Sequence, residues 1–194
     1  YLEGGQSYPF GIIEETVRVR RRPGGREFRD VPLRIRLTRR GPVISDHGMG
    51  VATGRLLSMR WSAPEAMQAD TGAFALFTAR DVAAARQAIG LSTAPYNYVI
   101  ADTAGNIGHA TGGRVPVRRR GDGSRPVPVT DGTDAWDGFV PPAAMPGQVN
   151  PARGWVGNAN HRTVTRDFPT PYSTFFAASW RYRRRLELLE SREQ

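Results

Sequence analysis

The sequence has no cysteine, no lysine and no long apolar run. The absence of cysteine excludes disulfides, thiolate metal sites and a cysteine nucleophile. A membrane-spanning helix needs about 18 or more consecutive apolar residues, and every run here is far shorter, so we expect no membrane partner. The first residues, Tyr1-Leu2-Glu3, have neither an initiating Met nor the pattern of a signal peptide, which predicts an internal piece of a longer protein.

The basic residues are all arginine: there are 27 of them against 18 acidic residues, for a net charge of +9. Proteins that bind nucleic acids normally use both lysine and arginine, because lysine serves well as a point charge on phosphate. Exclusive use of arginine, with abundant Ala, Gly and Pro, is typical of coding bias in a GC-rich bacterium. The charge therefore favours a solvated surface, and we expect no nucleic-acid partner.

One basic cluster keeps a nucleic-acid-binding module as an alternative. Residues 181–185 are rich in arginine, and Phe175, Phe176, Trp180 and Tyr182 lie beside them in the sequence. Aromatic rings between basic side chains are the pattern of a single-stranded nucleic-acid surface. At helical spacing the same rings more often form a buried stripe whose arginines face water, and the sequence favours this second interpretation.

Strands dominate the predicted secondary structure. Alternating apolar and polar residues predict a hairpin of two strands at 12–22 and 31–39, with its turn at Pro23-Gly24-Gly25. Further strands are predicted at 41–44, 56–61, 96–102, 107–110 and 155–160. The residues rich in Pro and Gly between 112 and 151 predict a long ordered loop.

Two regions have helical character. An alanine-rich segment at 63–90 predicts helices, with Thr78 as the N-cap of the second helix and Asp81 at its third position. Ser173 is predicted to cap a final helix over residues 174–192. A chain of 194 residues with this pattern is expected to form one α+β domain of mainly antiparallel strands plus helices.

The sequence contains no recognisable motif for binding a metal or a cofactor. The three histidines, His47, His109 and His161, stand in no zinc-binding arrangement, so surface or hydrogen-bonded imidazoles are the favoured interpretation. The carboxylates of a turn-rich region lack the spacing and the final Glu of a calcium loop; they are Asp122, Asp131, Asp134 and Asp137. We therefore expect no cofactor and no metal ligand in this chain.

The segment Asn158-Ala159-Asn160 is the most informative polar pattern. On a strand, two Asn residues around a small residue would lie on the same face. Taken alone, the pattern most simply indicates two Asn residues at the end of a strand whose side chains form hydrogen bonds with the adjacent loop. The motifs around it change this interpretation.

Five short motifs stand in a fixed order. They are LTRRGPVI at 37–44, YVIADTAGNIG at 98–108, WDGFVPP at 136–142, Asn150-Pro151 and GWVGNAN at 154–160. Together they resemble the β subunit of the penicillin acylase family, a group of N-terminal-nucleophile amidohydrolases. The chain departs from the family at Arg40, where a His is usual. On this resemblance, residues 1–194 are a partial β-subunit domain that lacks the nucleophile region and the α subunit.

The resemblance implies a fold and a mechanism. The fold is an αββα sandwich, and a Ser at the N-terminus of the β subunit, freed by autoproteolysis, attacks an amide carbonyl to form an acyl-enzyme. By alignment, Asn160 donates to the oxyanion and Arg181 supports the nucleophile site, while Tyr96 and Asn97 line the substrate pocket.

Further expectations follow from the same resemblance. The substrate is a linear N-acyl amide of the penicillin, N-acyl homoserine lactone or lipopeptide type. Calcium is possible in the parent protein, with ligands mostly outside these residues, and the parent is expected in the periplasm or secreted. The 194 residues alone are expected to be inactive and to self-associate. A non-catalytic interaction module stays as a further alternative.

Overall fold

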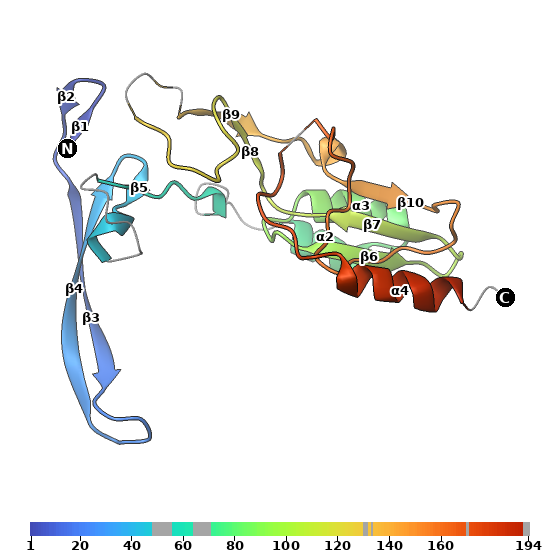
Figure 1. The fold of residues 1–194 in the computed structure, drawn as a ribbon, viewed down its shortest axis with the longest axis horizontal. Coiled ribbons are helices and arrows are strands. Elements are labelled where there is room, and N and C mark those ends of the chain that lie inside the picture. Colours follow the sequence, from blue (N-terminus) through green and yellow to red (C-terminus); the bar gives the residue numbers. More distant parts are fainter. Residues whose placement is uncertain (48–55, 64–70, 130–131, 133, 170, 192–194) are drawn as a thin grey trace. The chain divides into compact units, whose positions relative to one another are not determined.

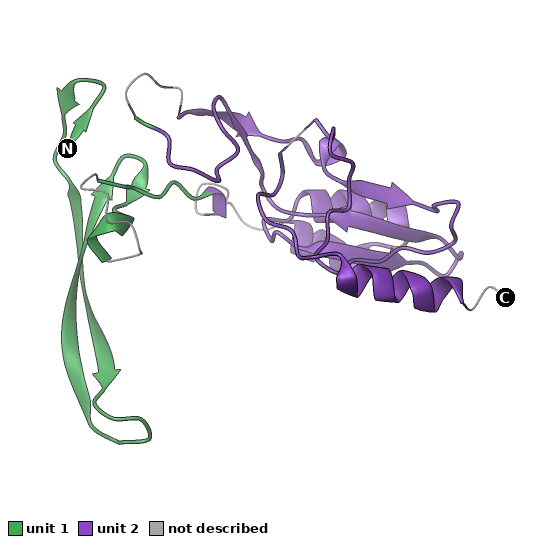
Figure 2. Ribbon diagram, in the orientation of Figure 1, with its two compact units in different colours: residues 1–61, 128–133 green, residues 62–127, 134–194 purple. Residues whose placement is uncertain are grey.

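The computed structural model describes residues 1–47, 56–63, 71–129, 132, 134–169 and 171–191. The chain divides into two compact units, one of residues 1–61 and 128–133 and one of residues 62–127 and 134–194 (Figure 2). Parts of four predictions lie outside the described residues. They are positions 64–70 of the helical segment, positions 130, 131 and 133 of the predicted loop, Asp131 of the carboxylate group and Arg192 of the final helix.

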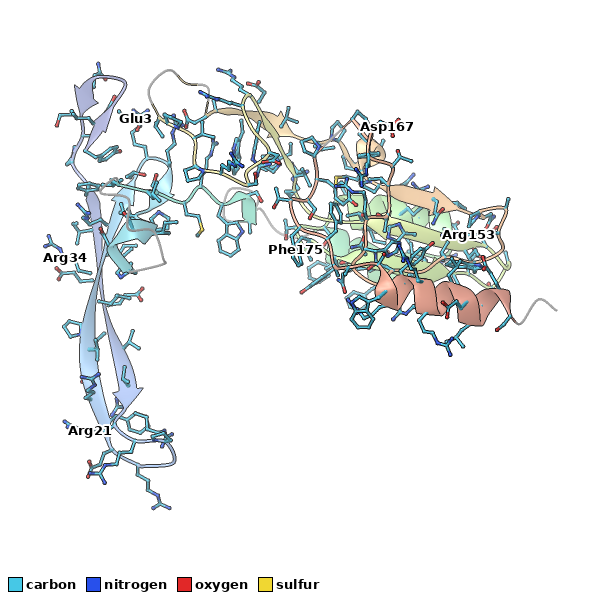
Figure 3. All side chains as sticks on the ribbon, in the orientation of Figure 1. Glu3, Arg21, Arg34, Arg153, Asp167 and Phe175 are labelled. Carbon is cyan, nitrogen blue, oxygen red and sulfur yellow. The ribbon has the colours of Figure 1, made fainter. Side chains whose placement is uncertain are left out.

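The first unit is built on a long two-stranded ribbon. Strands β3 (Gly11–Arg20) and β4 (Phe28–Thr38) pair antiparallel along their whole length (Figure 1). The turn between them holds Gly24 at φ 73°, a conformation that glycine adopts without the steric cost of a Cβ. The predicted hairpin is confirmed, and Arg21 lies at its turn end (Figure 3).

Short elements complete this unit. Strand β5 (Gly41–Pro42) pairs with the end of β4, β1 (Leu2–Glu3) pairs with β2 (Gln6–Ser7), and the 3-10 helix η1 covers Ile44–His47. The strand predicted at 56–61 was wrong, because Ser58 alone pairs, in a single bridge with Val43.

Both faces of the ribbon are open in the described residues. Ile12 and Ile13, which point to opposite faces of β3, are 41% and 40% exposed, and Val17 and Phe28 are similarly exposed. A two-stranded hairpin is at best marginally stable in water by itself. Self-association of the isolated 194 residues therefore stays a prediction, supported by this uncovered apolar surface.

The second unit contains a three-stranded antiparallel sheet in the order β10-β7-β6 (Figure 1). Its strands are β6 (Asn97–Ala101), β7 (Ile107–Thr111) and β10 (Gly147–Val149). Helices α2 (Thr71–Thr78) and α3 (Val82–Gly90) pack together, and α3 packs on β7. The buried apolar side chains of this unit are Val82, Ala85, Ala88, Ile89, Ala110, Val140, Met145 and Ala159.

Helix α3 begins at a cap that differs from the prediction. Asp81 is the N-cap, and its carboxylate accepts a hydrogen bond from the Ala84 backbone N–H at 2.7 Å. Thr78 instead ends α2 and donates to the Ala75 carbonyl. The prediction of Thr78 as the cap was wrong, because Asp81 has the extended backbone and the oxygen acceptor that a cap requires.

The motif at 98–108 contains the turn between β6 and β7. Asp102 accepts hydrogen bonds from the backbone N–H groups of Ala104 and Asn106 and from the Asn106 side chain. These bonds, that of the Asn106 side chain first, lower the pKa of Asp102. Asn150 donates to the Asn106 side chain at 2.8 Å and accepts from the Ile107 N–H at 2.9 Å. Two motifs far apart in sequence therefore meet at one end of the sheet.

The segment 112–151 is more regular than predicted. It contains β8 (Pro116–Arg118), β9 (Trp136–Phe139), the 3-10 helix η2 (Pro142–Ala144) and β10. Strand β10 is only three residues long and gains its stability from pairing with β7, with Gln148 opposite His109. Local composition could not reveal a strand that depends on so distant a partner.

The final helix, α4 (Trp180–Glu190), starts later than predicted. Ser173 does not cap it, because its hydroxyl exchanges hydrogen bonds with Phe175 in the preceding loop. The predicted buried aromatic stripe was also wrong, since Phe175 and Trp180 are 82% and 68% exposed. Within the described residues, no helix has the length and apolar character needed to cross a membrane.

Candidate functional site

The segment that carries Asn158 and Asn160 is an irregular turn, and the strand predicted at 155–160 was wrong. The Asn158 side-chain Oδ1 accepts the Asn160 backbone N–H at 2.9 Å, and Asn160 has φ 60°. Asparagine tolerates this left-handed conformation better than most residues. The two side chains therefore do not share a strand face: Asn158 folds back on the turn, and Asn160 is exposed.

Arg181, in the first turn of α4, binds this segment directly. Its Nη2 donates to the Ala159 carbonyl at 3.0 Å and to the Asn160 side-chain Oδ1 at 2.9 Å. The sequence prediction named Asn160 and Arg181 as catalytic candidates, and the fold brings the two side chains into contact across 21 positions of the chain.

This contact fixes the orientation of the Asn160 amide. A guanidinium group only donates hydrogen bonds, so the oxygen of the amide must face Arg181 and the NH₂ group must face away. Within the described part of the chain, no hydrogen bond engages the Asn160 Nδ2. An exposed amide NH₂ with a fixed direction is a donor available to an external oxygen.

Rings flank the turn. The imidazole of His161 stacks on Tyr182 of α4, with centroids 3.7 Å apart and planes at 16°. Arg153, labelled in Figure 3, donates to the Tyr182 hydroxyl at 3.3 Å and lies 4.1 Å from the centroid of the Trp155 ring. Burial, followed by the positive charges of Arg153 and Arg185, lowers the pKa of His161, so the imidazole in this stack is neutral near pH 7.

Two polar atoms beside the turn lack partners. Asn158 Nδ2 and His161 Nδ1 are buried and make no hydrogen bond within the described residues. Buried polar atoms nearly always have a hydrogen-bond partner in native proteins. Hydrogen bonds therefore hold the backbone of the turn, whereas two of its buried side-chain nitrogens have no hydrogen-bond partner in the described residues.

Asn97 belongs to a second polar cluster on the sheet. Its side-chain Oδ1 accepts from the Thr111 hydroxyl at 3.0 Å and from His109 Nε2 at 3.1 Å. His109 and Thr111 are buried at 3% and 7% exposure. Tyr96, the other predicted substrate-binding residue, is 64% exposed and meets the ring of Tyr98 edge to face.

The fold brings only some of the predicted site residues into contact. Asn160 and Arg181 are in direct contact, whereas the side-chain hydrogen bonds of Asn97 within the described residues go to β7. From the sequence, His109 and His161 were expected to be ordinary imidazoles, and Arg153, Tyr182 and Arg185 were not predicted as site residues. The available signal for Arg185 was its position four residues after Arg181.

The buried imidazole of His109 predicts a pH dependence of stability. Burial lowers the pKa of His109 in the folded state, followed by the charge that His161 carries when it is protonated and by the positive charges of Arg153 and Arg86. The unfolded chain takes up a proton near pH 6.5, so this contribution to stability is complete above that pH and is lost as the pH falls below it. We expect the melting temperature of the full-length protein to fall between pH 7 and pH 5.

A matched variant isolates this contribution. His109→Gln keeps a side-chain N–H donor toward Asn97 and cannot take up a proton, so its melting temperature should fall less over the same range. Part of the slope should remain, because the pKa of His161 is lowered as well. Equal losses in the wild type and in His109→Gln would refute the assignment.

A metal site receives no support from the described residues. No group of three or more His, Asp or Glu side chains among them could hold an ion.

The chain is similar to proteins of known activity. A sequence model of the family described as penicillin amidase matches residues 1–194. The chain is 32% identical over 197 residues to the acyl-homoserine lactone acylase QuiP of Pseudomonas aeruginosa, covering 96% of this chain and 22% of that protein. It is 33% identical over 191 residues to the penicillin acylase 2 proenzyme of a Pseudomonas species, covering 97% and 24% respectively.

A solved structure shows the same fold. The thermostable penicillin G acylase from Alcaligenes faecalis superposes with a TM-score of 0.69 at 22% sequence identity, covering 94% of this chain and 31% of that chain. The predicted α+β class is thereby confirmed, and the fold of these residues is similar to the matching part of that penicillin acylase. The chain spans less than a quarter of the length of the two curated relatives above.

Proposed function

Because the chain belongs to the penicillin amidase family, we propose that it forms part of a hydrolase of linear N-acyl amides in which Asn160 stabilises the oxyanion. The observation that carries this proposal is the hydrogen bond from Arg181 to the Asn160 Oδ1 at 2.9 Å. This bond directs the amide NH₂ outward, where it can donate to a negative oxygen.

The proposed reaction is acyl transfer through an N-terminal serine that lies in sequence outside these 194 residues. The serine hydroxyl loses its proton to its own α-amino group as its oxygen attacks the amide carbonyl carbon. The carbonyl oxygen becomes an anion, the C–N bond then breaks, and the leaving amine takes the proton. Water attacks the resulting ester, and the carboxylic acid and the serine hydroxyl are released.

Asn160 is suited to the anionic stage of this reaction. An amide donates a hydrogen bond without being able to take up the charge, and it donates more strongly to an anion than to a neutral carbonyl. Arg181 then acts by holding the amide and adds positive charge nearby. Removal of one oxyanion donor typically costs about 10²–10³ in rate, and this is the contribution that we propose for Asn160.

The substrate class is proposed at the level of the acyl amide. The names of the two relatives concern penicillin and acyl-homoserine lactones, and both compounds contain a linear amide between an acyl chain and a ring. We propose that the exposed ring of Tyr96, next to Asn97, contacts the acyl chain. The remainder of the β subunit and an α subunit are the proposed partners of this chain.

An acid-release assay tests the proposal. The full-length protein, after any self-cleavage, is incubated with penicillin G, N-acyl homoserine lactones of several chain lengths and an N-acylated peptide. Mass spectrometry should detect the free acid and the free amine in equal amounts for at least one of them. A self-cleaved protein that converts none of these compounds would contradict the proposal.

Nucleic-acid binding is the second candidate, and the exposed Phe175 and Trp180 beside the arginines of α4 favour it. The same protein should then bind single-stranded DNA with an affinity that falls steeply with salt. The stacking of Tyr182 on His161 weighs against this candidate, because the ring is occupied within the protein.

A further inference from the structure

Arg181 is not the only residue of helix α4 that binds the turn of Asn158–Asn160. Arg185, one helical turn later, donates from Nη1 to the Asn158 carbonyl, while Arg181 donates to the Ala159 carbonyl. Residues four apart lie on the same side of a helix, so the two guanidinium groups bind adjacent carbonyls of the turn. The Asn160 carbonyl accepts the Ala177 N–H at 2.7 Å, so all three carbonyls of the turn are bound.

Tyr182 of α4 contacts residues that precede and residues that follow this turn in sequence. Its ring stacks on His161, which follows Asn160 directly, with centroids 3.7 Å apart. Its hydroxyl accepts from Arg153, and its ring centroid lies 6.3 Å from that of Trp155, both of which precede the turn. One side chain of α4 therefore contacts the segments entering and leaving the turn.

These contacts replace the support that a strand would supply. Residues 155–160 belong to no strand, and Asn160 has the left-handed φ of 60°. The direction of the Asn160 amide consequently depends on contacts made by side chains of α4.

We infer that Tyr182 and Arg185 are positioning residues for the Asn160 amide, holding the turn that carries it. This inference rests on the proposed function of Asn160. Neither residue needs to touch the substrate, because Tyr182 acts through the His161 ring and Arg185 acts through the Asn158 carbonyl.

The effect should appear in kcat. A donor displaced by about 1 Å can cost up to about 10² in rate, so Tyr182→Leu and Arg185→Gln should each lower kcat of the full-length protein about ten- to a hundredfold. KM should change little, because the donor acts chiefly in the transition state. Tyr182→Phe keeps the ring that stacks on His161 and should retain kcat within about threefold of the wild type.

Arg184 supplies a matched control. It neighbours Arg185 in the same helix, but its guanidinium pairs with Glu187 of α4 at 2.9 Å and its side chain is 68% exposed. Arg184→Gln should leave kcat unchanged. Melting temperatures measured for all variants separate a displaced donor from a destabilised protein.

A double-mutant cycle keeps the inference testable even where a variant is less stable. If Tyr182 acts through Asn160, Tyr182→Leu should have little further effect on kcat once Asn160 is replaced by Gly. An equal loss with and without the Asn160 amide would overturn the inference, as would wild-type kcat in both Tyr182→Leu and Arg185→Gln. A wild-type protein that hydrolyses no amide would instead refute the proposed function itself.

Discussion

Asn160→Gly should lower kcat of the full-length protein about 10²–10³-fold and leave its melting temperature nearly unchanged. Glycine is the sharpest replacement, because Asn160 has φ 60° and glycine adopts that conformation without strain. Asn160→Ala should lower kcat to a similar extent, with an added loss of stability from the Cβ in the left-handed region. Steady-state kinetics and thermal melting on the same preparations measure both quantities.

Asn158 is the control for this prediction. Its Oδ1 accepts the Asn160 N–H, so Asn158→Ala removes the bond that shapes the turn and should lower the melting temperature. Its effect on kcat should be smaller than that of Asn160→Gly. The two variants must be compared directly, because the buried Asn158 Nδ2 is also a donor without a partner in the described residues. Loss of turnover in Asn158→Ala at unchanged stability, with a mild Asn160→Gly, would move the catalytic role to Asn158.

Arg181→Leu is the second variant with a large expected effect. Without the guanidinium, the Asn160 Oδ1 loses the only donor that it has among the described residues, and the amide is able to rotate. The turn also loses the bond to the Ala159 carbonyl. We expect kcat to fall about 10²-fold, because a poorly oriented donor contributes little in the transition state.

Conservative and neighbouring variants define what Arg181 does. Arg181→Lys keeps a cationic donor but loses the planar fork, so its kcat should lie between those of Arg181→Leu and the wild type. Arg183→Leu changes an exposed arginine of the same helix and should leave kcat unchanged. A kcat for Arg181→Leu within about threefold of the wild type would show that Asn160 orients without this contact.

Local patterns predicted the hairpins of this fold well. Alternating apolar and polar residues predicted β3 and β4, and the glycines around Gly24 predicted the turn between them. The turn between β6 and β7 depends on Asp102 and Asn106, which are also close in sequence. Strand β10 was missed, because its three residues become a strand only by pairing with β7 nearly 40 positions earlier. The start of α4 was missed because Ser173 bonds within its own loop.

The candidate site was predictable in part. Asn160 and Arg181 were both named from the sequence, but the resemblance to a family supplied them, and no local pattern could show that they touch. The turn at 158–160 was mistaken for a strand, because its geometry depends on arginines of α4 more than 20 positions away. His109 was overlooked because burial comes from tertiary packing, which a single His in the sequence does not reveal.

The central claim is that the Asn160 amide stabilises the negative oxygen of the transition state. The most direct test compares the inhibition constant of a boronic acid, which forms a tetrahedral anionic adduct with a serine hydroxyl, in the wild type and in Asn160→Gly. The constant should rise by about the same factor by which kcat/KM falls, about 10²–10³, while the affinity for the carboxylic acid product stays nearly the same. An inhibition constant that does not change while kcat/KM falls would contradict the claim.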